Sequence, residues 1–252
     1  IYSITDNSTI IGNGTYNNIT RTITWILSGD GEVLSHGGGF ANITVNVRKD
    51  VPLNTEIINY ATVYFPSVPE ETRTNGIVSI VKPIINTLRN TGFDTIQAAI
   101  DDNSTLSGDI ITIAAGNYTE NVYLNKNLTI KSFNNDSVTV TASNINLPVF
   151  NVDSNGNGTT IQGLIIQGAI NTSGIFLNSA NNCTLINNTI TGNNIGILVL
   201  GNENNIIGNN ASNNGWAGIC LSGVTLNSMN YNTVSGNPEG IYILNGYNNT
   251  FN

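Results

Sequence analysis

Residues 174–200 read GIFLNSANNCTLINNTITGNNIGILVL and begin a pattern that recurs every 22 residues to the end of the chain. Glycine and isoleucine return together at each step, and a second apolar position and an asparagine keep the same spacing. The registers are Gly174, Gly196, Gly218 and Gly240; Ile175, Ile197, Ile219 and Ile241; Leu185, Ile207, Met229 and Phe251; and Asn188, Asn210 and Asn232. A fixed period of this length predicts a solenoid, because no single repeat can bury its own apolar side.

Apolar residues alternate with outward positions inside each repeat, as Ile197 and Val199 do around Leu198. A period of two residues indicates strands, and the abundant Asn and Gly oppose a helical repeat. We therefore expect a parallel β-helix with 22-residue coils, in which like residues stack about 4.8 Å apart. The asparagine register then predicts an amide ladder that satisfies backbone groups at a bend.

A short helix is expected just before the first coil. Asp94 is a suitable N-cap with Gln97 three positions later, and Ile96, Ala99 and Ile100 share one face. Such a helix would cover the open end of the coil stack, which would otherwise expose unpaired strand groups. Strands are expected to follow near residues 110–113, 122–124, 128–130 and 138–140.

Two stretches carry a family resemblance. FDTIQAAID followed by GDIITIAAGNYTENVYLNKNLTIKS resembles the opening of right-handed parallel β-helix proteins of the pectin lyase-like superfamily. NNTITGNNIGILVLGNENNII resembles the Asn-rich repeats of adhesin-like members from microbial, often archaeal, surfaces. The resemblance covers residues 93–252 and implies the fold, whereas it says little about activity.

Residues 1–82 lack the period. Short candidate strands near residues 22–27, 43–47, 57–65 and 77–81, with turns between them, suggest a small β-sandwich. The stretch TITWILSGDGEVLSHGGGFANITVNVRKDVPLNTEIINYATVYF resembles the immunoglobulin-like repeat domain of bacterial and archaeal surface proteins. The predicted organisation is thus all-β: a sandwich over residues 1–82, a linker at 83–92 and a β-helix over 93–252.

The amino-acid composition limits the classes of molecule that this protein can bind. The net charge is −8, the pI is about 4.4 and only 10% of residues are charged, which argues against nucleic-acid binding. The 46 asparagines include 14 in N-x-S/T sequons. Thirteen of these are candidate glycosylation sites: Asn7, Asn13, Asn18, Asn42, Asn103, Asn117, Asn127, Asn135, Asn157, Asn171, Asn182, Asn187 and Asn248. The fourteenth, Asn210, is assigned to the ladder instead. A chain this rich in Asn and Thr also generates sequons by chance.

No catalytic residue is predicted. Enzymes of the resembled superfamily use an Arg with calcium-binding carboxylates, or clustered Asp with Arg or Lys, but this chain has no Arg after Arg89 and no His after His36. Asp136 and Asp153 lie about one coil apart, and we interpret them as solvated turn residues. Asp153, Asn155 and Asn157 match the first half of a calcium loop, so Ca²⁺ is the one cofactor considered. Leu164 stands where the loop needs Glu, which favours a plain turn.

The leading hypothesis is a non-enzymatic microbial cell-surface protein, structural or adhesin-like, glycosylated and extracellular. Its partners would be glycans or neighbouring surface proteins, with no nucleic acid and no membrane contact by this segment. One alternative is a carbohydrate-active β-helix lyase or esterase whose active coils lie outside these residues. Another is a subunit of a filament or surface lattice. The absence of a leader and the stop inside a coil suggest a fragment of a longer polypeptide.

Overall fold

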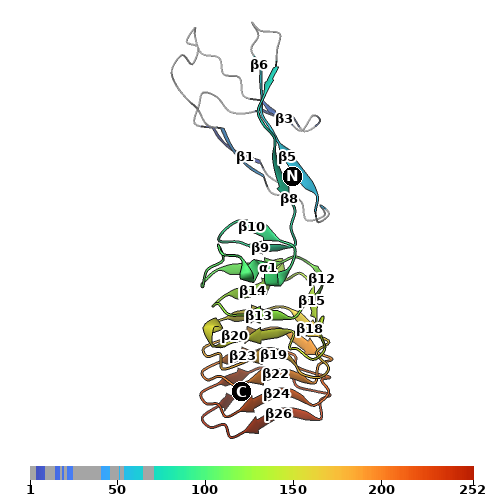
Figure 1. Cartoon of the computed structure of the whole chain (residues 1–252), viewed down its shortest axis with the longest axis vertical. Helices are drawn as coiled ribbons and strands as arrows, with labels where there is room; N and C mark the ends of the chain where they lie inside the picture. The colour runs from blue at the N-terminus through green and yellow to red at the C-terminus, as the bar shows by residue number, and fades with distance from the viewer. Residues whose placement is uncertain are drawn as a thin grey trace. The chain divides into compact units, whose positions relative to one another are not determined.

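The computed structural model describes residues 4–8, 15–17, 19, 22–24, 41–45, 51, 54–64 and 71–252. The chain divides into two compact units, Ile1–Thr55 and Glu56–Asn252. Figure 1 shows their elements, and nearly all of them are strands.

Antiparallel pairs form the N-terminal part. In the first unit β1 (Ile4–Ser8) pairs with β4 (Ala41–Val45), and β2 (Thr15–Asn17) pairs with β3 (Thr22–Thr24). In the second unit β5 (Glu56–Asn59) pairs with β8 (Ile77–Ile80), and β6 (Thr62–Tyr64) pairs with β7 (Glu71–Arg73). Five of these strands, β3, β4, β5, β6 and β8, overlap the candidate ranges of the sequence, whereas β1, β2 and β7 lie outside them. The immunoglobulin-like sandwich stays a prediction, because most of residues 1–54 lies outside the described part.

The rest of the second unit is a parallel β-helix, as predicted, with three sheets running along its length (Figure 1). Sheet 1 has the order β10 (Thr91–Phe93), β9 (Ile84–Asn86), β11 (Ile110–Ile113), β14 (Thr129–Ser132), β17 (Thr160–Gln162), β20 (Thr184–Ile186), β23 (Asn205–Ile207), β25 (Ser228–Asn230) and β27 (Thr250–Phe251). Sheet 2 contains β12 (Gly116–Thr119), β15 (Val138–Thr141), β18 (Ile165–Gln167) and β21 (Thr189–Thr191). Sheet 3 contains β13 (Val122–Leu124), β16 (Phe150–Val152), β19 (Ser173–Leu177), β22 (Ile195–Val199), β24 (Ala217–Ser222) and β26 (Glu239–Leu244).

The isoleucine register forms the interior of sheet 3. Ile175, Ile197, Ile219 and Ile241 pair in successive strands, and the first three are fully buried. The glycine register lies one residue earlier, where the backbones of adjacent coils meet. A Cβ on Gly196 would lie 2.5 Å from the carbonyl oxygen of Gly218, which is closer than a side chain allows. The two sheet 3 registers are therefore confirmed.

The two other registers are wrong by one residue in one coil. Leu185 pairs with Ile206, and Ile206 pairs with Met229, so Ile206 and not Ile207 points inward. Likewise Asn188 bonds to Asn209, and Asn209 bonds to Asn232. Asn210 is an exposed strand residue outside the ladder.

Two compensating changes in turn length explain the error. The turn from Val199 to Ile206 is one residue shorter than the equivalent turn from Leu177 to Leu185. The turn before β24 is one residue longer than its equivalent in the other coils and contains Trp216, so it restores the length of the coil. The paired residues of sheet 3 thus stay 22 residues apart, whereas those of sheets 1 and 2 are shifted by one residue in this coil. The short turn also presses Gly201 against the previous coil, where a Cβ would lie 1.8 Å from the carbonyl oxygen of Ala180.

From Asn188 onward, inward asparagines close all three corners of the coils, not one corner as the sequence suggested. Between sheets 1 and 2 the ladder is Asn188, Asn209 and Asn232; between sheets 2 and 3 it is Asn193, Asn214 and Asn237; between sheets 3 and 1 it is Asn204, Asn227 and Asn249. Each side-chain oxygen accepts from the backbone N–H of the preceding coil, as Asn209 Oδ1 does from Asn188 at 3.0 Å. The amides therefore pair backbone groups that the bends remove from the sheets.

Helix α1 (Ile96–Asp101) caps the coil stack, as predicted, with Ile96, Ala99 and Ile100 fully buried. Its N-cap is Thr95, whose hydroxyl accepts from the Ala98 N–H; the expected N-cap Asp94 instead pairs with Lys82 at 2.7 Å. A carboxylate from the first coil completes the helix start, since both Glu120 oxygens accept backbone N–H groups of the first helical turn. Negative charge is favourable at this end of a helix.

Gln97 and Lys126 attach this helix to the first coil. The Gln97 side chain accepts from the N–H of Tyr123 and donates to its carbonyl. It thus pairs with the edge strand β13 as a neighbouring strand would, which protects the open edge. Lys126 Nζ donates to the carbonyls of Ile100, Asp102 and Thr105 at the end of the helix, where a cation is favoured.

The linker predicted at residues 83–92 is wrong, because these residues belong to the β-helix. β9 pairs with both β10 and β11 and extends sheet 1, and Ile84 is fully buried. An ion pair with the buried carboxylate of Asp109 fixes this hairpin: Arg89 Nε and Nη2 donate to the two oxygens of Asp109 at 2.9 and 3.0 Å. Asn86 Nδ2 and the Leu106 N–H also donate to Asp109 Oδ2.

Adjacent asparagines test the corrected register. Asn209→Ala removes a buried amide and leaves the Asn188 N–H and the Leu185 carbonyl without partners. At about 1–3 kcal/mol for each buried group, we expect a loss of roughly 2–5 kcal/mol in the free energy of unfolding. Asn210→Ala, the matched control, should change it by less than about 0.5 kcal/mol because this side chain is exposed. Equal losses in urea denaturation would contradict the register.

Asp109 predicts an acid dependence. The Arg89 hydrogen bonds, helped by those from Asn86 and Leu106, lower the pKa of Asp109 from 3.8 to about 2. Because the folded pKa is the lower one, this stabilisation is complete above pH 3.8 and is lost as the pH falls toward 2. It amounts to at most about 2 kcal/mol, because solvent at the exposed side of Arg89 screens the pair. In urea titrations between pH 5 and pH 2, Asp109→Asn should lose less stability than the parent, because it has no carboxylate to protonate at this position. Both proteins should still lose some stability, because their other carboxylates titrate. An identical slope would contradict this.

Candidate functional site

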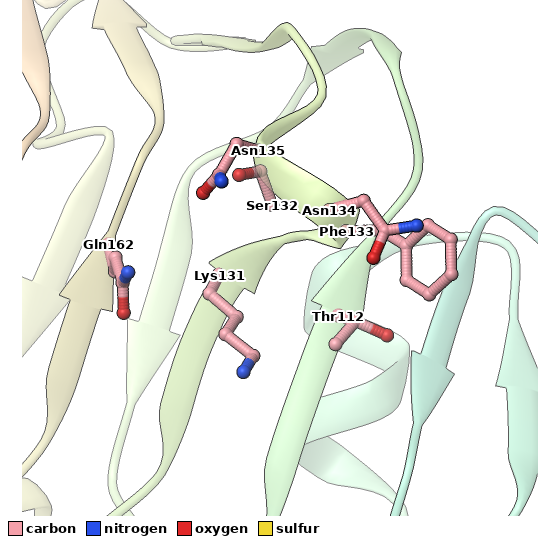
Figure 2. Close-up of a pocket in the computed structure, with 7 residues that line it drawn as sticks. All are labelled: Thr112, Lys131, Ser132, Phe133, Asn134, Asn135 and Gln162. Carbon is pink, nitrogen blue, oxygen red and sulfur yellow. The ribbon is translucent and has the colours of Figure 1, made fainter.

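A shallow pocket of about 270 Å³ lies on the outward face of sheet 1. Thr112, Lys131 and Gln162 stand in one column across β11, β14 and β17. The turn from Ser132 to Asn135 forms the rest of its lining, and Figure 2 shows these side chains around it. Sequence patterns alone do not reveal this site, because the column becomes visible only once the coil register is known.

The turn beside the pocket depends on two asparagines in left-handed conformations. Asn134 and Asn135 have φ of 49° and 60°, within the 3₁₀ turn Phe133–Asn135. Asparagine tolerates this region better than other residues with a Cβ. The turn closes when the Asp136 N–H donates to the Phe133 carbonyl at 2.8 Å, and it leaves the Phe133 ring 43% exposed.

Lys131 supplies the one charge in the pocket. Within the described ranges its ammonium group has no hydrogen-bond or ion-pair partner, whereas Lys82 pairs with Asp94 and Lys126 binds carbonyls. None of the seven lining residues is acidic. Hydrolysis of a glycosidic bond requires two carboxylates across the bond. The pocket can therefore donate hydrogen bonds and one positive charge, but it holds no acid–base pair.

The two aspartates weighed as carboxylate candidates lie at different corners. Asp136 precedes β15 at the corner between sheets 1 and 2, whereas Asp153 follows β16 at the corner between sheets 3 and 1. Asp153 is the N-cap of the 3₁₀ turn Ser154–Gly156, and its Oδ1 accepts from the N–H groups of Asn155 and Gly156. Its other oxygen accepts the Tyr123 hydroxyl, which raises the pKa of that phenol. Asp153 thus has a structural role.

The half-matched calcium loop is occupied by hydrogen bonds within the protein. Asp153 caps the turn as described, and Asn157 Oδ1 accepts the N–H of Asn181 in the next coil at 2.7 Å. No group of three or more His, Cys, Asp or Glu side chains that could hold a metal occurs in the part of the chain that the structure describes. Asp153 Oδ1 and Asn157 Oδ1, two oxygens that a calcium ion would need, therefore already accept backbone N–H groups.

The sequons form the second candidate site, and all ten within residues 54–252 are exposed. They are Asn103, Asn117, Asn127, Asn135, Asn157, Asn171, Asn182, Asn187, Asn210 and Asn248. Asn7, Asn13, Asn18 and Asn42 have side chains outside the described residues. Asn210 therefore joins the candidates, since it is not a ladder residue. By contrast, none of the fully buried asparagines lies in a sequon.

The exposed sequons differ in whether the nitrogen that would carry a glycan is already bonded. Asn171 Nδ2 donates to Asn146 Oδ1 at 2.7 Å and joins two loops. In the described structure, the side chains of Asn182 and Asn210 make no hydrogen bond. A glycan on Asn171 would disrupt that loop contact, whereas one on Asn182 or Asn210 would extend into solvent.

The two cysteines do not form a reactive site. Both are buried free thiols, and burial raises the pKa of each. Cys183 takes an inward corner position where the next coil has Asn204, whose Oδ1 accepts the Cys183 N–H. Cys220 lies on the outward side of sheet 3, between Leu198 and Tyr242.

Comparisons with known proteins agree with the fold. Residues 149–252 match the family model described as "Right handed beta helix region", so the solenoid is a right-handed parallel β-helix. Over 98 residues, 39% of this chain, the sequence is 43% identical to a cell surface glycoprotein from the archaeon Methanothermus fervidus. The chain spans only 16% of the length of that protein.

A solved structure with a similar fold is that of the pectate lyase Pel9A. The TM-score is 0.48 at 16% sequence identity, over 66% of this chain and 51% of that one. In the described ranges, no helix of our structure is both long and apolar enough to span a bilayer.

The pocket chemistry predicts that the β-helix does not cleave acidic polysaccharides. We expect no unsaturated product from polygalacturonate, measured by ultraviolet absorbance, with or without added Ca²⁺, because Lys131 has no partnering carboxylate in the pocket. Product formation that disappears in Lys131→Met, Asp136→Asn or Asp153→Asn would contradict this. Thr184→Ala, a sheet 1 substitution away from the pocket lining, is the control.

Proposed function

We propose that this chain is part of a non-enzymatic, glycosylated cell-surface protein in which the β-helix is a rigid structural element. The observation that carries the proposal is the segregation of asparagines. The nine asparagines of the three ladders are buried or half-buried and lie outside sequons, while the ten described sequons face solvent. The similarity to a cell surface glycoprotein over 98 residues supports the same assignment.

The physical character of the coils suits such a role. Hydrogen-bonded sheets run along the stack and three amide ladders join its last coils, so bending would break many bonds at once. The outer surface is polar but carries few charges, because only 10% of the chain is charged. Glycans on the exposed corners would hydrate it.

Absence of enzyme activity is part of the proposal. It is supported by the pocket, which has one free amine and no acid, and by the structural bonding of Asp153. The adhesin-like role is a finer form of the same hypothesis, in which the glycans or proteins of neighbouring surfaces are the ligands.

Glycopeptide mapping of the protein from its native source tests the proposal. We expect glycans on Asn182 and Asn210, whose side chains are exposed and unbonded, and lower occupancy at Asn171, whose Nδ2 is bonded to Asn146. The Asn171 peptide is thus an internal control. A native protein without any glycan on the ten exposed sequons would refute the glycosylated-surface assignment.

A further inference from the structure

The outward side of sheet 3 carries an apolar surface of its own. Ile195, Ala217 and Cys220 are buried in a cluster separate from the interior core, and Leu198, Trp216 and Tyr242 pack against it. Trp216 and Tyr242 have ring centroids 5.2 Å apart. The alternation of β22 and its neighbours places Leu198, Cys220 and Tyr242 outside, since Ile197 and Val199 point into the interior. Ile195 and Ala217 pack with these outward residues and not with the interior core.

More exposed side chains extend the same surface. Leu200 and Leu244 stand on either side of Ser222 in the neighbouring column and are 37% and 46% exposed. Phe176 continues the column of Leu198 upward to β19. We call the six residues Phe176, Leu198, Leu200, Trp216, Tyr242 and Leu244 the sheet 3 face. In Figure 1 its strands β19, β22, β24 and β26 lie one below another.

This face is poor in charge and lacks sequons. One residue is charged among the four strands and the two flanking residues Leu200 and Trp216. It is Glu239, at the edge of the sheet. None of these residues is the asparagine of a sequon. The described sequons lie instead at the corners, on sheet 2 and beside the cap. A surface that is left apolar, uncharged and without glycan acceptors is typical of a protein contact.

We infer that the sheet 3 face binds the same face of a second copy of this chain. Two chains of net charge −8 repel each other, so they can approach closely only where neither carries charge. A face that contacts itself also satisfies two-fold symmetry, and its columns repeat at the same strand spacing in both copies. This extends the proposed function, because it would join surface molecules side by side.

A sugar ligand fits this face less well. Binding of a saccharide needs polar groups that fix its orientation around the aromatic rings. The sheet 3 face offers Leu, Phe, Trp and Tyr side chains and a buried thiol, and its polar groups are the Tyr242 hydroxyl and Ser222 between the two leucines. Stacked aliphatic columns favour an apolar protein partner.

The area of the face predicts weak association. Four strands about 4.8 Å apart and about six residues long present roughly 400 Å², which is about half of what each partner of a stable interface buries. Isolated molecules should therefore dimerise only at high concentration. Many copies held on one surface would associate more strongly through their raised effective concentration.

Sedimentation equilibrium of the full, unglycosylated chain over a concentration series tests the inference. We expect the mean mass to rise toward that of a dimer. Leu200→Glu and Leu244→Glu should each weaken dimerisation at least tenfold, because a charge would enter the contact. Ile207→Glu, an outward substitution on sheet 1, is the control and should dimerise like the parent. Thermal melting establishes that each variant is folded.

A parent that stays monomeric at every concentration would overturn the inference. So would a dimer that survives both leucine substitutions, or one that is lost in Ile207→Glu, since the contact would then lie elsewhere. A monomer whose tryptophan fluorescence changes with added oligosaccharide, and no longer changes in Trp216→Phe, would assign the face to sugar binding instead, since Trp25 is the other tryptophan. None of these results bears on glycan occupancy, so the proposed function is tested separately.

Discussion

The structure depends on closing the backbone hydrogen bonds at the bends between sheets. A strand that leaves one sheet to enter the next leaves N–H and C=O groups without partners, and a buried unpaired group is costly. The inward asparagines solve this, because one amide can accept from the coil before it and donate to the coil after it. Asn209 does so with Asn188 and Asn232. Every other feature of the coils must accommodate these amides.

This constraint produces a four-residue pattern at the corners of the repeats. A left-handed residue comes first, then a buried ladder residue, an outward strand residue and an inward apolar one, as in Asn187 to Ile190. Left-handed positions favour Gly and Asn, and outward strand positions favour Thr. Asn187 and Thr189 therefore form a sequon, whereas Asn188 is followed two residues later by a core isoleucine. The fold itself separates sequons from buried asparagines, so measured occupancy decides whether they are used.

The sequence predicted the architecture because the strongest signal, the Ile register of sheet 3, belongs to strands whose spacing does not change. The registers predicted from the sequence are wrong where a shortened turn is offset by a lengthened one in the same coil. One residue lost before Asn204 and one gained at Trp216 preserve the period while moving Asn210 out of the ladder. The hairpin of β9 was mistaken for a linker because its pairing is nonlocal, with β11. The pocket at Lys131 could not be predicted, since its column is made by register alone.

The gained residue connects the corner constraint with the outer surface. A turn enlarged by one residue keeps Asn214 in its ladder, where it bonds to Asn237. It also places Trp216 outside the coil, over Ala217 and Cys220, where it packs against Tyr242. Without the extra residue in this turn, Ala217 and Cys220 would have no side chain over them. The break in the repeat thus makes sheet 3 unlike the two other sheets, and an apolar surface arises on a solenoid whose other sides are polar and rich in sequons.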